Sequence, residues 1–181
     1  FQKPHPPVWI PGGGSVETWD FCAANDFVYG ALTYYGYKMV RETVRGYWER
    51  VAAHGRDDNP HRLAVTQFIG VADSDAEAYS LYREPAEYFF NRSLHVYPGF
   101  TDAPGYITEA SVRARYKSQV RQVARNKQAK HDLTWDEMVE NGYVVVGGPD
   151  TVREQLEEAA RELRIGHLCA MLPFGNMSDE R

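Results

Sequence analysis

The stretch Trp9–Phe21, WIPGGGSVETWDF, places three consecutive glycines between a short apolar run and a sequence that favours a helix. The run Pro7–Ile10 is short, apolar and β-prone, which predicts a buried strand. Ser15 is a residue type that commonly caps a helix N-terminus, and Glu17 would stabilise the positive end of the helix dipole. The stretch therefore predicts a strand, a glycine turn and a helix in direct succession.

A turn of this kind can hold an anion. The first N–H groups of a helix lack partners within the helix, and glycine lets the backbone approach a ligand closely. Ser15 and Thr18 add two hydroxyl donors one turn apart. The pattern is neither a Walker loop, which needs GK[ST], nor a convincing GxGxxG. Taken alone, the motif favours a flexible turn whose Ser15 is only an N-cap, and Glu17 would repel phosphate unless it points outward.

Strand-like segments recur along the rest of the chain, separated by helical ones. Further strands are expected at three apolar runs, namely Asp26–Gly30, Leu63–Val71 and His167–Leu172. Val144–Val146 is a shorter apolar segment between the last two runs. The alternation predicts βα units with a parallel sheet, an α/β fold, and we expect residues 1–181 to form a single domain.

Helical segments are indicated by apolar residues that recur every three or four positions. One such segment is Tyr37–His54, and another begins at Pro149, which suits the first turn of a helix. A capping box at Ser74 begins a third helix, which Pro85 should limit or kink. Val112, Tyr116, Val120 and Val123 mark a further long helix. Its basic residues could attract an anionic partner, although a solvated helix face is the favoured alternative.

The composition narrows the classes of function. With 43% hydrophobic and 25% charged residues, the chain resembles an ordinary globular protein, and its net charge of −5 offers no overall attraction to nucleic acid or to an anionic membrane. No apolar stretch approaches the roughly 18–20 residues of a membrane span, and no signal peptide is recognisable. Cys22 and Cys169 lie in apolar surroundings, so we expect two buried thiols and a cytoplasmic location. The histidine spacing predicts no metal site.

Three segments occur in an order that resembles a known family. They are PVWIPGGGSVETWDFCAAND from Pro7, RLAVTQFIGVADSDAEA from Arg62 and VVVGGPDTVREQLEEAARELRIGHLCAMLPFGNM from Val144. Together they resemble the luciferase-like flavin monooxygenases, the family of bacterial luciferase. The resemblance implies a partial TIM-type (β/α)8 barrel, roughly its C-terminal four βα units, because a whole barrel needs about 250 residues. We therefore expect the chain to be a segment of a longer protein.

The resemblance also implies a cofactor and a reaction. The expected activity is oxygenation of a small organic substrate with O2 and reduced FMN (FMNH2), which a partner flavin reductase would supply. In that family a Ser and a Thr three residues later bind the flavin phosphate, and Ser15 and Thr18 match that spacing. Gly14, where the family often has an acidic or small residue, would offer a backbone N–H. Catalytic residues are not assigned, because the catalytic histidine is expected in the absent N-terminal half.

Other interpretations stay open. His95 and Tyr97 lie in a Pro/Gly-rich loop that could line the substrate pocket or its lid, or be an ordinary loop with exposed aromatic residues. The chain could also be a non-catalytic flavin-binding protein with a truncated barrel, or an F420-dependent oxidoreductase of the same superfamily. Half a barrel leaves unpaired strand edges and an apolar inner face, so we expect a homo- or hetero-oligomer and self-association of the isolated chain.

Overall fold

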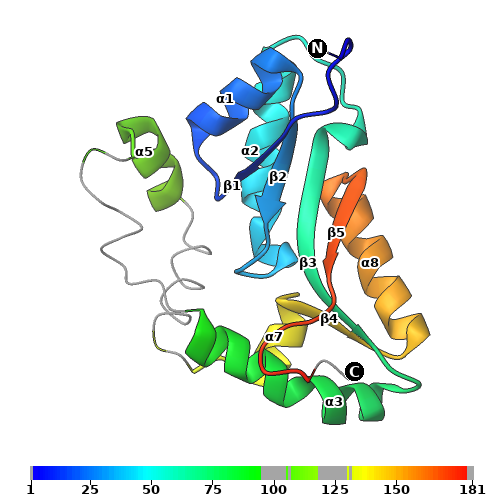
Figure 1. Cartoon of the computed structure of the whole chain (residues 1–181). Coiled ribbons are helices and arrows are strands. Elements are labelled where there is room, and N and C mark those ends of the chain that lie inside the picture. The colour runs from blue at the N-terminus through cyan, green and yellow to red at the C-terminus, as the bar shows by residue number, and fades with distance from the viewer. Residues whose placement is uncertain (1, 95–104, 106, 118–129, 131, 179–181) are drawn as a thin grey trace.

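Figure 1 shows the computed structural model of the chain. The structure describes residues 2–94, 105, 107–117, 130 and 132–178. The described part contains a parallel sheet of five strands: β1 (Trp9–Gly12), β2 (Val28–Leu32), β3 (Leu63–Val71), β4 (Val144–Gly147) and β5 (His167–Met171). All four pairings between them are parallel, which confirms the α/β fold predicted from the alternating pattern.

Strand β3 pairs with three other strands because it is long enough for two of them to share one edge. Ala64 pairs with Gly30 of β2 and also with His167 of β5, so β2 and β5 lie on opposite edges. Phe68 pairs with both Met171 of β5 and Val144, so β4 lies opposite β5 and follows β2 along the same edge. The hydrogen-bonded sheet therefore runs β1-β2-β3-β4, and β5 pairs with the opposite edge of β3 (Figure 1).

Six α-helices connect or follow the strands in the described part. They are α1 (Val16–Asn25), α2 (Tyr37–Ala53), α3 (Asp75–Tyr88), α5 (Glu109–Lys117), α7 (Trp135–Glu140) and α8 (Pro149–Leu163). Helix α2 ends one residue before the predicted boundary, and Ser74 caps α3 as the capping box predicted. Pro85 neither ends nor limits α3, which continues to Tyr88 and passes into a π-helical turn at Phe89–Ser93. The predicted long helix after Val112 lies partly outside the described residues.

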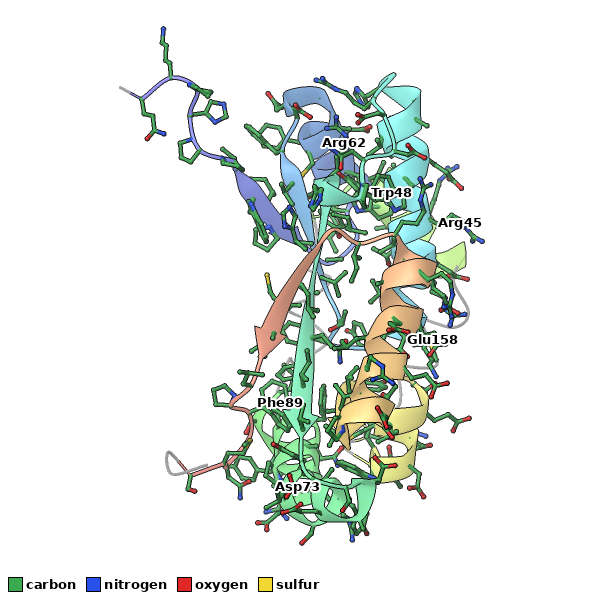
Figure 2. The ribbon with its side chains drawn as sticks, turned by 90° about the vertical axis from the view of Figure 1, so that its right-hand side faces the viewer. Arg45, Trp48, Arg62, Asp73, Phe89 and Glu158 are labelled. Atoms are coloured by element: carbon green, nitrogen blue, oxygen red, sulfur yellow. The ribbon has the colours of Figure 1, made fainter. Side chains whose placement is uncertain are left out.

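Side chains that alternate along β3 pack into two separate apolar clusters. Leu63, Val65 and Ile69 face a cluster built with residues of α1, α2 and α8. Phe68 faces the other way and packs against Phe89, Phe90 and Phe174, with ring centroids 4.8, 5.4 and 5.7 Å from its own. This period of two is the direct consequence of the strand pleat. Figure 2 shows Phe89 near the end of β3 that Asp73 follows, and Trp48 and Arg62 near the other end.

The two cysteines differ in exposure, which corrects the prediction that both are buried. Cys22 is buried within α1, and burial raises the pKa of its thiol to about 11. Cys169 is exposed. It pairs with Thr66 of β3, and in the described part β3 is the only strand partner of β5. An apolar neighbourhood along the sequence therefore did not translate into burial at the sheet edge.

Replacing Phe68 should destabilise the fold strongly. The ring is 1% exposed and lies against four other aromatic rings, those of Tyr34, Phe89, Phe90 and Phe174. Phe68→Ala therefore leaves a cavity that we expect to cost about 3–5 kcal/mol in the free energy of unfolding. Urea denaturation followed by tryptophan fluorescence measures this loss. Val71→Ala on the same strand is the matched control, because Val71 is 48% exposed and its loss should stay within about 0.5 kcal/mol. Equal effects of the two substitutions would contradict this account of the core.

The isolated 181-residue chain should self-associate. Trp9 of β1, Leu168 of β5 and Leu172 are 41%, 43% and 58% exposed, and each of the two strands has one partner in the described part. Open strand edges beside exposed apolar side chains favour pairing with another chain. Sedimentation velocity should show species heavier than the 20.6 kDa monomer. A monodisperse monomer that melts cooperatively would contradict the prediction.

Candidate functional site

The three glycines between β1 and α1 differ in their surroundings. A side chain would clash at the first, would have space at the second and would be disfavoured by the backbone conformation at the third. A Cβ at Gly12 would lie 2.9 Å from the Tyr29 ring, whose hydroxyl donates to the Gly12 carbonyl over 2.8 Å. A Cβ at Gly13 would meet no heavy atom within 4 Å. Gly14 is buried and has φ of +105°, a conformation that residues with a side chain rarely adopt. The turn is therefore held rigidly at its base and is open beyond Gly13.

Ser15 is the N-cap residue of α1, as predicted, but its hydroxyl does not cap the helix. Its backbone is extended (φ −81°, ψ 130°), and its carbonyl accepts from the Trp19 amide over 3.2 Å. The Ser15 hydroxyl instead donates to a carboxylate oxygen of Glu17 over 2.6 Å. Thr18 lies beside the turn, with its methyl carbon 3.3 Å from the position of a Cβ on Gly12. Ser15 and Thr18 thus both lie beside the turn, and their binding of phosphate stays a prediction.

The first turn of α1 is closed by a hydroxyl from α5. The Val16 amide donates to the hydroxyl oxygen of Ser111 over 3.1 Å, and the Ser111 hydroxyl donates to Glu17 Oε2 over 2.7 Å. Thr108 precedes the first residue of α5, and its hydroxyl donates to Oε1, the other carboxylate oxygen of Glu17. Ser111 is fully buried. Thr108 and Ser111 are functional candidates that sequence reasoning missed, because Ser111 lies 95 positions from Val16 and no local pattern links the two.

Glu17 is turned toward this cluster of hydroxyls. Hydrogen bonds from Ser15, Thr108 and Ser111 lower the pKa of its carboxyl from 4.5 to about 2. Hydroxyl donors stabilise the ionised form of a carboxylate. At neutral pH the Glu17 carboxylate therefore carries a full negative charge beside the turn that the sequence marks as a phosphate site.

The N-termini of the other helices near the ends of the strands are already filled. In α8, Asp75 accepts from the Gly148 amide over 2.7 Å and from the Thr151 hydroxyl over 3.0 Å, and these bonds lower the pKa of Asp75. In α3, the Ser74 hydroxyl accepts from the Glu77 amide over 3.2 Å. A carboxylate already neutralises the positive end of the α8 dipole. In α1 the Val16 amide donates to the uncharged hydroxyl of Ser111, so this helix N-terminus, unlike that of α8, has no carboxylate on its amide.

The remaining candidate residues do not add to this site. His95 and Tyr97 lie outside the described residues. His167, the first residue of β5, contacts the rings of Trp9 and His61 with centroid distances of 4.8 and 4.9 Å. Within the described residues, no group of three His, Cys, Asp or Glu side chains is placed to hold a metal ion, and no helix could cross a membrane.

A cavity of about 560 Å³ lies away from the glycine turn, between α8 and the face of β3 and β5 that this helix covers. Its lining is mostly apolar and includes Val65, Val152, Leu156 and Leu168. The cavity is large enough for a small ligand. It contains none of the residues of the turn, so its size alone does not make it the candidate active site.

Comparison with solved structures shows what the fold resembles. The oxygenating constituent of 3,6-diketocamphane monooxygenase from Pseudomonas putida, solved in complex with FMN, shares 19% identity and superposes over 93% of this chain with a TM-score of 0.62. The monooxygenase RslO1 from Streptomyces bottropensis shares 15% identity over 99% of this chain, with a TM-score of 0.60. An F420-dependent secondary alcohol dehydrogenase, in complex with an F420-acetone adduct, shares 13% identity over 93%, with a TM-score of 0.51.

The chain spans less than half of each of these proteins, namely 42%, 44% and 43% of their lengths. A partial TIM-type barrel, as the resemblance implies, accounts for this coverage and for the parallel pairing of the five strands. No curated protein matches the sequence. The family model for luciferase-like monooxygenase matches residues 1–167, which is most of the chain. The chain therefore belongs to the luciferase-like monooxygenase family.

Proposed function

We propose that this chain is the phosphate-binding part of a flavin-dependent monooxygenase that uses reduced FMN and O2 to oxygenate a small organic substrate. One observation carries the proposal. The Val16 amide, at the start of the helix after β1, already holds an oxygen acceptor, and Ser15 and Thr18 flank it. A helix N-terminus with added hydroxyl donors is suited to bind a phosphate.

Space and hydrogen-bond donors at the turn support a phosphate site there. The space beyond Gly13 is open. Gly14 has a positive φ that only glycine adopts readily, so the backbone turns into α1 with no side chain at this position. The hydroxyls of Ser15 and Thr18 and the Val16 amide would hold the phosphate oxygens. The Ser111 hydroxyl oxygen stands where a ligand oxygen would accept from Val16.

The cofactor, when bound, supplies the two electrons for a reaction in which one oxygen atom enters the substrate and the other becomes water. The described residues of this chain contribute binding and orientation of the phosphate end. A separate flavin reductase would supply the reduced cofactor, and the complete enzyme would be a homo- or hetero-oligomer.

A deazaflavin cofactor is the second candidate, because one of the structures that the chain resembles is F420-dependent. F420 also carries phosphate, so the α1 N-terminus would serve either cofactor. Titration with FMN and with F420 distinguishes the two. Tight FMN binding without oxygenation of any substrate, even with reductase and O2 present, would instead favour a non-catalytic flavin-binding protein.

Removing both hydroxyls should weaken FMN binding. In the natural gene product that carries these residues, Ser15→Ala combined with Thr18→Ala should raise the FMN dissociation constant about 10- to 100-fold. The reason is the loss of two hydrogen bonds to a charged group, each worth roughly 1.5–3 kcal/mol and partly replaced by water. Flavin fluorescence titration measures the change.

The matched control is Ser74→Ala, which removes a serine from the N-cap of α3, where its hydroxyl accepts from Glu77. Its effect should be confined to stability, with the FMN dissociation constant unchanged. If the Ser15/Thr18 double variant binds FMN as tightly as the unsubstituted protein, the phosphate lies elsewhere and the proposed site is wrong.

A further inference from the structure

Two groups at the start of α1 that a phosphate would need already have partners, one of them in α5 and the other in α1 itself. The Val16 amide donates to Ser111, and the Ser15 hydroxyl donates to Glu17, whose carboxylate is itself held by Ser111 and Thr108. An N–H group makes one well-aligned hydrogen bond, and a hydroxyl has a single proton to donate. Neither group can therefore serve a phosphate oxygen while the present contacts persist.

The contact with α5 is small and depends on these same bonds. Figure 1 shows α5 lying apart from the sheet. The side chains of residues 107–114 make hydrogen bonds to one other described part of the chain, the segment Ser15–Glu17. The ion pair between Arg113 and Glu109 lies within α5 itself. A ligand that takes over the Val16 amide would thus remove a bond between α1 and α5, and one that also takes the Ser15 hydroxyl would remove a bond to Glu17, the carboxylate that Thr108 and Ser111 hold.

The negative charge of Glu17 would also favour release of α5 when a phosphate binds. Glu17 is ionised and lies in the first turn of α1, within 2.7 Å of the hydroxyl that occupies the Val16 amide. A phosphate bound at that amide would face this carboxylate, and like charges at such short range repel. The Glu17 side chain, and with it the hydroxyls of Thr108 and Ser111 that it binds, would have to turn away.

We propose that Ser111 and Glu17 form an autoinhibitory latch, in which α5 closes the N-terminus of α1 until a phosphate group displaces the Ser111 hydroxyl. The proposal rests on the proposed function, since it concerns the same phosphate site. It assigns a role to Glu17 that a simple phosphate site does not explain. An acidic residue beside the turn weakens anion binding on its own, but here it holds the covering helix in place.

Hydrogen–deuterium exchange of peptides covering residues 107–114 tests the latch. In the natural gene product, saturating FMN should increase exchange of these amides several-fold. Riboflavin, which has the same ring system without the phosphate, should leave it unchanged. Protection of 107–114 by FMN, or an equal effect of riboflavin, would overturn the proposal.

Two variants test the latch without relying on the cofactor. Ser111→Ala removes the hydroxyl that occupies Val16, and Glu17→Gln removes the charge while keeping the size of the side chain. Both should raise exchange of 107–114 in the absence of any ligand. Both should also bind FMN about 3- to 10-fold more tightly, the factor that corresponds to one neutral hydrogen bond. Ser80→Ala, an exposed serine of α3, is the control and should change neither quantity.

The outcomes separate the latch from the proposed function. If the Ser15/Thr18 double variant loses FMN affinity but Ser111→Ala binds FMN more weakly, Ser111 is a ligand of the phosphate and the latch is wrong while the site stands. If ligand-free Ser111→Ala and Glu17→Gln leave exchange of 107–114 unchanged, the contact does not hold α5 and the latch is also wrong. If the double variant binds FMN normally, both proposals fail.

Discussion

The backbone of β3 has two hydrogen-bonding edges, and three other strands use them. Strand β5 occupies one edge, while β2 and β4 occupy successive parts of the other. A strand of nine residues is needed for this arrangement, because β2 pairs with Leu63–Thr66 and β4 with Phe68–Val71. Every parallel strand then ends at the same side of the sheet. The turn after β1 and the N-termini of α1, α3 and α8 are positioned by this single constraint.

Competition for helix N-termini decides which of them can bind an anionic ligand. Asp75 reaches across from α3 to the first turn of α8 and places a carboxylate on the Gly148 amide. A Cβ at Gly147 would lie 2.7 Å from that carboxylate, so the glycine makes room for it. The many TIM barrels that bind phosphate after strands seven and eight use a helix N-terminus there. In this chain the amide at the start of α8 already carries the negative charge of Asp75.

The same physical chemistry has opposite consequences at the two helices. The Asp75 carboxylate joins α3 to the start of α8 through a strong hydrogen bond, because an ionised acceptor on a backbone amide is stronger than a neutral one. A neutral hydroxyl on the Val16 amide of α1 forms a weaker bond than an ionised acceptor would. Glu17 strengthens the contact between Val16 and Ser111 indirectly. Its carboxylate accepts hydrogen bonds from three hydroxyls and keeps them oriented.

The sequence by itself determined the local features. The apolar run and the glycines specified a strand and a turn, and Ser15 an N-cap, because backbone conformation and capping depend on adjacent residues. The prediction that this strand is buried was wrong, since β1 lies at the sheet edge and Trp9 is 41% exposed. The alternating pattern predicted a parallel α/β sheet, and three ordered segments indicated the family. Only the tertiary structure decided that β4 shares an edge with β2, that Cys169 is exposed, and that Ser111 holds the Val16 amide. These features depend on contacts between residues far apart in the chain. Local periodicity carries no information about which distant residue a given residue will contact.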